Sequence, residues 1–99
     1  MSNSRSIIET KEIEPDRPLP FLVHHIPGRV RFRIYRLKDD SDYGANLQQF
    51  LLAQPGINGV RINSYAASIA INYRYQDAPL AKIASNLTQL IQQADNYSR

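Results

Sequence analysis

Two adjacent histidines, His24 and His25, are the side chains in this sequence best suited to bind a metal. Imidazole is the commonest transition-metal ligand near neutral pH, and a single ring suffices as the axial ligand of haem iron. Adjacent side chains on an extended strand point to opposite faces, so both rings reach one ion only if a bend at Pro27 and Gly28 rotates them. The pair therefore has two interpretations: a ligand for a transition metal or haem, or partly exposed polar residues on an edge strand. Two copies of the chain could supply further ligands.

A row of arginines follows the histidines. Arg29, Arg31 and Arg33 alternate along the chain, and Arg36 comes shortly after them. The planar guanidinium group suits carboxylate and phosphate partners, so we predict that these four arginines contact an acidic protein partner. Nucleic acid is a weaker candidate, because the outward row predicted for residues 67–75 offers no aromatic ring on which bases could stack. The alternative is a solvated sheet face whose charges keep an open edge from aggregating.

Three aspartates, Asp39, Asp40 and Asp42, form the other candidate group of ligands. Carboxylates suit hard cations such as magnesium or calcium, but the spacing is not that of an EF-hand loop and the required glycine is missing. We therefore interpret residues 38–42 as a polar loop in which Ser41 or Asp42 caps the following helix.

The composition argues against several classes of protein. The 99 residues carry a net charge of +3 at pH 7, with 42% hydrophobic residues and no cysteine. Disulfides, thiolate metal sites and cysteine nucleophiles are therefore excluded. The sequence has no serine–histidine–aspartate order, no pair of catalytic carboxylates and no phosphate-binding glycine loop, so we predict a non-enzymatic domain. No apolar run reaches the length of a membrane span or a signal peptide, so we expect a cytoplasmic protein without a membrane span.

The hydrophobic pattern predicts two helices and at least three strands. Alternation of Val30, Phe32 and Ile34 with charged or polar residues is typical of a strand with one buried face. Apolar residues at helical spacing predict one helix over residues 42–54 and a second that starts near Asp77. The same strand-like alternation appears in residues 59–63 and 67–75.

These elements predict an α+β fold of the ferredoxin-like type, βαββα, in which two helices cover one face of an antiparallel sheet. Its last strand is either absent or replaced by the extended residues 21–25. We expect strands 59–63 and 67–75 to form a hairpin, and strands 29–35 and 67–75 to be joined in parallel through crossovers. An open edge beside residues 29–35 could also pair with a second copy of the chain.

We predict a flexible arm over residues 1–20, one domain over residues 21–95 and a frayed tail over residues 96–99. The arm is rich in charged, small polar and proline residues, and cannot bury enough apolar surface to offset the entropy of ordering it. A single core is typical of a chain of this length.

Residues 51–63, which read LLAQPGINGVRIN, resemble the helix-to-strand junction of the heavy-metal-associated domain, and residues 67–73 resemble its third strand. The opening HIPGRVRFR, residues 25–33, resembles the cysteine-free second branch of that family. Such domains occur free-standing in bacteria and ahead of metal-transporting P-type ATPases, so the resemblance implies a role in metal homeostasis. The family's paired cysteines would fall near residues 38–44, which read KDDSDYG. Transfer of copper(I) or zinc by a thiolate pair is therefore not implied.

Overall fold

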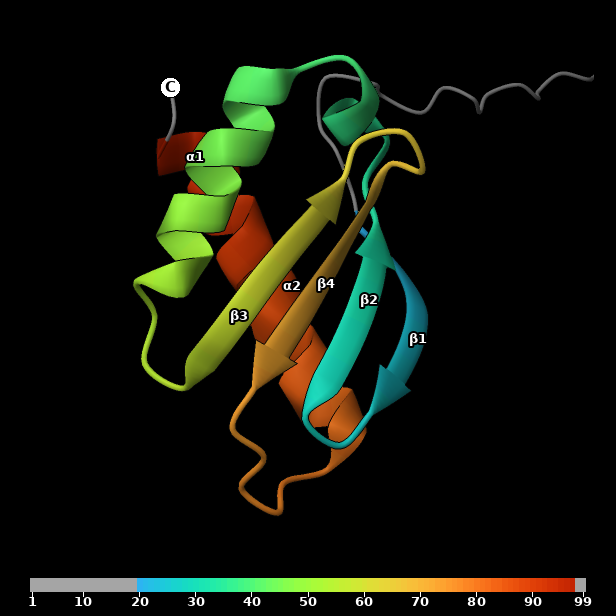
Figure 1. The fold of residues 1–99 in the computed structure, drawn as a ribbon. Helices are drawn as coiled ribbons and strands as arrows, with labels where there is room; N and C mark the ends of the chain where they lie inside the picture. Colours follow the sequence, from blue (N-terminus) through green and yellow to red (C-terminus); the bar gives the residue numbers. More distant parts are fainter. Residues whose placement is uncertain (1–19, 98–99) are drawn as a thin grey trace, which may run out of the picture.

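The computed structural model describes residues 20–97 (Figure 1). The strands are β1 (Phe21–Ile26), β2 (Arg29–Arg33), β3 (Ile57–Asn63) and β4 (Ser68–Tyr73). The helices are the 3-10 helix η2 (Tyr35–Lys38) and the α-helices α1 (Ser41–Leu52) and α2 (Leu80–Tyr97). Among these described residues, no helix is long and apolar enough to cross a membrane. Residues 1–19 of the predicted arm and residues 98–99 of the predicted tail lie outside the described residues.

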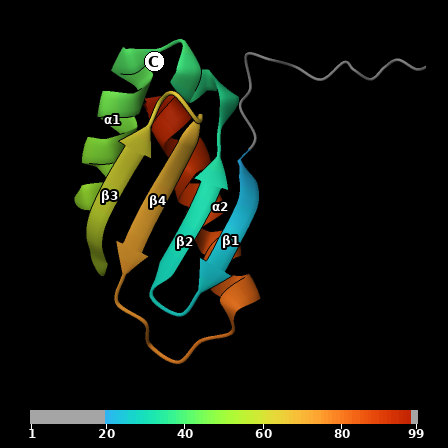
Figure 2. The same cartoon turned by 45° about the vertical axis from the view of Figure 1, so that its right-hand side comes forward.

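The four strands form one sheet in the order β1-β2-β4-β3, and every neighbouring pair is antiparallel (Figure 2). The α+β class and the antiparallel sheet agree with the prediction, and β1 supplies a fourth strand beside β2. The expected parallel arrangement of strands 29–35 and 67–75 is wrong, since β2 and β4 run antiparallel. The connection through α1 makes β3 run in the same direction as β2. The β3–β4 hairpin then reverses the chain, so β4 runs opposite to both strands.

A two-residue turn at Pro27 and Gly28 joins β1 to β2. Gly28 has a φ of +91°, in the left-handed region that glycine adopts without steric cost and that tight hairpin turns require. The amide of Tyr73 donates a hydrogen bond to the carbonyl oxygen of Gly28, 3.0 Å away. The bend predicted at Pro27 and Gly28 is therefore a hairpin turn that is also attached to β4.

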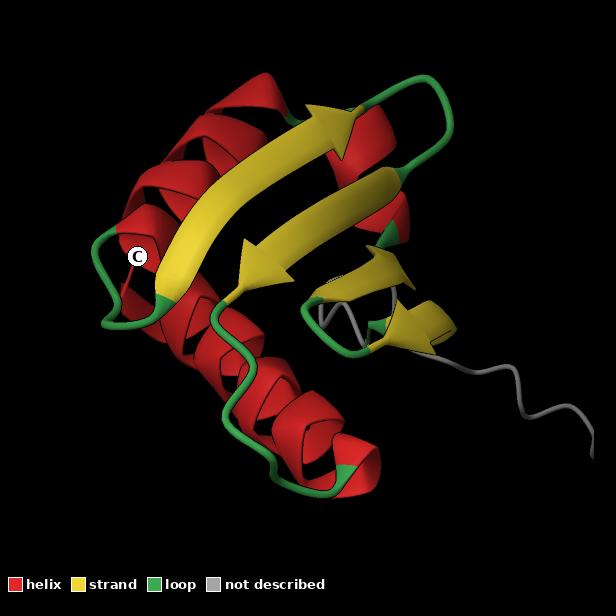
Figure 3. Cartoon of the chain, turned by 60° about the horizontal axis from the view of Figure 1, so that its bottom comes forward, coloured by secondary structure: helices red, strands yellow, loops and turns green. Residues whose placement is uncertain are grey.

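Both α-helices pack on one face of the sheet, and the core lies between the helices and the sheet (Figure 3). The apolar rows that face the helices are buried. The side chains exposed by no more than 1% are Val30 and Phe32 of β2, Ile34 directly after it, and Ile69 and Ile71 of β4. The helices contribute the buried side chains of Leu47 and Leu51 from α1, and of Leu87, Ile91 and Ala94 from α2. The other face of the sheet carries no helix among the described residues (Figure 3).

The N-cap of α1 is Asp40, rather than Ser41 or Asp42 as predicted. Its Oδ1 accepts a hydrogen bond from the Tyr43 amide at 3.0 Å, and its Oδ2 accepts one from Arg36 Nε at 3.1 Å. The Tyr43 amide, followed by Arg36, lowers the pKa of the Asp40 carboxyl below its ordinary value. The helix starts one residue early because η2 leaves Asp40 in the non-helical conformation that a cap requires.

Candidate functional site

The helix-free side of the sheet carries the predicted arginine row of β2. Residues that pair directly in an antiparallel sheet project from the same face, so the register identifies their neighbours on the other strands. His24 of β1 and Ala70 of β4 lie on either side of Arg31, and Arg61 of β3 pairs with Ala70. We call the full set the open face: Phe21, His24, Ile26, Arg29, Arg31, Arg33, Gly59, Arg61, Asn63, Ser68, Ala70 and Asn72.

The open face is strongly cationic. It contains four arginines and one histidine but no aspartate or glutamate. Within residues 20–97, none of these four guanidinium groups pairs with a carboxylate. Arg61 was not among the predicted site residues, although its alternation with Val60 and Ile62 already placed it outward. It lies two strands from Arg31, on the order of 10 Å away, so it extends the charged surface across the sheet.

The two histidines lie on opposite faces of the sheet. His24 pairs with Arg31 and projects from the open face, where its side chain is exposed. His25 pairs with buried Val30, so it projects toward the helices and is half-buried. The Pro27–Gly28 turn therefore does not bring the two rings of one chain together.

A hydrogen bond fixes the ring of His25. Its Nε2 lies 2.7 Å from the phenol oxygen of Tyr73, and the two rings meet edge to face with centroids 5.9 Å apart. The Tyr73 hydroxyl also lies 3.4 Å from the carbonyl oxygen of Ile26. These contacts attach β1 to the end of β4, with Nδ1 as the remaining ring nitrogen of His25. Tyr73 lies in residues 67–75, which were predicted to form a strand, but its contact with His25, 48 positions away, left no signal in the sequence.

We expect stability to fall in mild acid because of His25. Burial, and then the charge of His24, lower the pKa of His25 below its ordinary value. The unfolded chain therefore binds the proton more readily than the folded chain, so protonation favours unfolding. The urea midpoint should decrease as pH drops below about 6.5, the ordinary histidine pKa, and level off below the folded-state pKa. His25→Gln should reduce this dependence.

The control for this expectation is His24→Asn, which removes the charge and keeps His25. NMR titration of the ring protons should show the pKa of His25 rising part of the way toward its ordinary value, since burial remains the larger cause. An unchanged pKa in this variant would contradict the charge contribution.

Arg36 lies apart from the rest of the predicted arginine row. It belongs to η2 rather than β2, and its guanidinium group forms an ion pair with Asp40 at 3.1 Å. The same group lies over the ring of Tyr43, 4.2 Å from the centroid. Arg36 therefore secures the start of α1, whereas Arg29, Arg31 and Arg33 project from the open face.

The described part of the chain has no ready-made cage for a metal ion. Across residues 20–97, no three histidine, aspartate or glutamate side chains gather closely enough to hold one. Asp40 is occupied at the helix cap, and the histidines face apart. A metal bound by this part of one chain would thus not be held by both imidazoles.

The two edges of the sheet differ. At the β3 edge, the side chain of Gln48 on α1 donates a hydrogen bond to the Val60 carbonyl at 2.9 Å. At the β1 edge, large apolar side chains remain 45–56% exposed: Phe21, Leu22, Val23 and Ile26. An exposed apolar edge strand is a surface to which a further strand can add.

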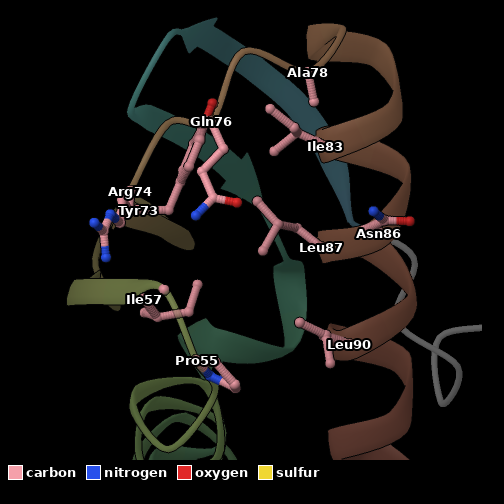
Figure 4. Close-up of a pocket in the computed structure, with 11 residues that line it drawn as sticks. Pro55, Ile57, Tyr73, Arg74, Gln76, Ala78, Ile83, Asn86, Leu87 and Leu90 are labelled. Atoms are coloured by element: carbon pink, nitrogen blue, oxygen red, sulfur yellow. The ribbon is translucent and has the colours of Figure 1, made fainter.

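A cleft of about 470 Å³ lies between α2 and the ends of β3 and β4 (Figure 4). Ile83, Leu87 and Leu90 extend into it from α2, opposite Ile57. The guanidinium group of Arg74 lies on the side away from α2 in this view. Arg74 is the charged member of the described residues that line the cleft, and these walls do not identify an occupant, so the open face is the better candidate site.

The described sheet and helices fall within the part of the chain that matches a known family. A family model described as heavy metal associated domain 2 matches residues 21–97. The chain belongs to this family. The comparisons with curated proteins and with solved structures found no match to the chain.

Membership in the heavy metal associated domain 2 family confirms the resemblance inferred from residues 25–33 and 51–63. It makes this chain a small domain related to metal homeostasis. The family match begins at Phe21 and so includes β1, which carries both histidines. The open face and the β1 edge are therefore parts of the heavy metal associated domain itself.

Proposed function

We propose that this protein is a small, non-enzymatic, cytoplasmic binding domain of metal homeostasis that holds a transition metal or haem through His24, His25 or both. The observation that carries the proposal is the position of His24, an exposed imidazole on a strand of a heavy metal associated domain. Imidazole binds transition metals and haem iron in its neutral form. The lowered pKa of His25 favours the same neutral form there.

The geometry limits how such a domain binds. Because the two rings of one chain face apart, His24 and His25 do not chelate one ion. Haem needs only one axial imidazole from the protein, whereas a bare ion needs further ligands, from a second copy of the chain or from water. His25 has one ring nitrogen engaged with Tyr73, so it would use the other.

Titration with cobalt(II), copper(II), zinc(II) and haemin tests the proposal. We expect the wild-type chain to bind at least one of these probes, and the His24→Ala/His25→Ala variant to lose that binding. A Tyr65→Ala variant, which alters a side chain that is 94% exposed on the β3–β4 turn, should bind like the wild type. Equal, weak binding by all three proteins would refute histidine ligation.

A second candidate function is a metal-free interaction module that contacts an acidic protein partner through Arg29, Arg31 and Arg33 of the open face. Arg36, the fourth predicted arginine, lies apart from them on η2 and pairs with Asp40. The interaction module is favoured by the open-face arginines, none of which pairs with a carboxylate within residues 20–97. The exposed β1 edge would add main-chain pairing to that partner, or to a second copy of the chain. Guanidinium groups suit carboxylates in such an interface.

A fluorescent peptide of ten glutamates is a suitable probe of this second function. Charge reversal in Arg31→Glu/Arg33→Glu should weaken its binding on the order of tenfold or more, with an unchanged circular dichroism spectrum, because both side chains are exposed. Lys82→Glu changes an exposed charge on α2, away from the open face, and is the matched control. If both variants bind the peptide equally, the arginine row has no special role.

A further inference from the structure

We propose that the ligand of the open face is an anionic metal chelate, an iron porphyrin with carboxylate side chains, bound with its iron on His24 and its carboxylates on Arg31 and Arg33. This inference rests on the proposed histidine ligation and specifies it in two respects. It assigns the ligand role to His24 rather than His25, and it assigns a negative charge to the form in which the metal arrives.

The surroundings of His24 select an anion over a bare cation. His24 lies directly opposite Arg31 in the β1–β2 ladder, at the roughly 5 Å spacing of cross-strand neighbours. Arg29 and Arg33 flank Arg31 on the same face, and Arg61 lies two strands away. No carboxylate of the open face offsets these charges. These positive charges repel a free divalent cation. They attract a chelate that carries more negative charge on its carboxylates than positive charge at its metal centre.

The shape of the open face and its side chains also suit a flat, largely apolar ring. On β1, Phe21 and Ile26 lie on either side of His24 and are 56% and 46% exposed. The β4 positions that face the arginines hold only the short side chains of Ser68, Ala70 and Asn72. A planar ring ligated by His24 would cover apolar surface along β1 and meet guanidinium groups along β2, which are the two kinds of contact a carboxylate-bearing porphyrin offers.

The inner side of β1 lacks these features. His25 faces buried Val30, and its Nε2 is engaged with Tyr73. The arginines of β2 project to the opposite side of the sheet from His25. A porphyrin at His25 would therefore have to displace packed side chains and would find none of the open-face guanidinium groups beside it.

The test compares haemin, metal-free protoporphyrin and cobalt(II) as probes of the full chain. We expect haemin to bind the wild type with the Soret shift of histidine-ligated iron, and cobalt(II) to bind at least tenfold more weakly. His24→Ala should lose the Soret shift, whereas His25→Ala should keep it. Arg31→Gln/Arg33→Gln should weaken both haemin and metal-free protoporphyrin on the order of tenfold, and Lys82→Gln should change neither.

The outcomes separate this inference from the broader function. Loss of the Soret shift in His25→Ala but not in His24→Ala would overturn the assignment to the open face, while histidine ligation would stand. Tighter binding of cobalt(II) than of haemin, lost in His24→Ala, would overturn the anionic ligand and keep the metal function. Absence of histidine-dependent binding for every probe would overturn both.

Discussion

Replacing Phe32 with alanine should lower the free energy of unfolding by about 3–5 kcal/mol, the usual cost of truncating a buried aromatic side chain. Phe32 is 1% exposed and lies on β2, where it pairs with Leu22 on β1 and with Ile69 on β4. Truncation removes the ring from the contact between the sheet and the helices and leaves a cavity that the neighbouring strands cannot close. Small domains are stable by only about 5–15 kcal/mol, so the variant should be close to unfolding at 25 °C.

The matched control for this prediction is the next residue along the strand. Arg33 projects from the open face and is exposed, so Arg33→Ala should change stability by less than about 0.5 kcal/mol. Urea unfolding followed by circular dichroism measures both variants. Similar losses at the two positions would contradict the assignment of one buried and one exposed face to β2.

The sequence predicted the parts of the fold that depend on local pattern. Alternation identified Val30, Phe32 and Ile34 as one buried row, and all three are buried. Helical spacing predicted a helix over residues 42–54, where α1 spans Ser41–Leu52. Burial of apolar side chains imposes these periods on the sequence, so they can be read from it. The direction of β2 relative to β4 depends on the path of the intervening chain, which no local pattern encodes, and there the prediction failed.

β1 shows why an edge strand is harder to predict. Five of its six residues are exposed, and the register shifts between Leu22 and His24, so the period of two disappears. Its extended conformation is fixed by pairing with β2 and by the turn at Pro27 and Gly28 rather than by its own hydrophobic pattern. The sequence could therefore offer this segment only as one possible replacement for the missing strand.

The candidate site was predictable to the extent that it depends on strand alternation. The rule that adjacent strand residues face apart correctly separated His24 from His25, and it places Arg31 on one face of β2. The contact between His25 and Tyr73 joins residues 48 positions apart, so only the three-dimensional structure reveals it. The role of Arg36 at the helix start depends on the non-helical conformation of Asp40. The sequence did not predict this conformation, because the adjacent Ser41 and the nearby Asp42 are equally suitable helix caps.

Substitution of Gly28 by valine should cost about 1–3 kcal/mol, because a β-branched residue at a φ of +91° is strained. Crowding is not the cause: a Cβ at this position would lie 3.6 Å from the Tyr73 carbonyl oxygen, an ordinary contact. The matched control is Gly44→Ala within α1, where a Cβ would meet Leu37 and Ile62 at 3.5 and 3.7 Å. That change should stabilise the chain by about 0.5–1 kcal/mol, as expected for alanine replacing glycine in a helix.

The part of the chain that loses stability in Gly28→Val distinguishes strain at the turn from destabilisation of the whole domain. β1 is an edge strand, and among the described residues it pairs only with β2, so strain at the turn should release β1 first. Hydrogen exchange should therefore accelerate at the β1 amides in Gly28→Val before it accelerates in β3. Because His24 is held opposite Arg31 by this same hairpin, the variant should also weaken whatever binding depends on both residues. Equal acceleration across β1 and β3 would mean that the hairpin opens only with the whole domain, and that the turn does not control the position of His24 independently.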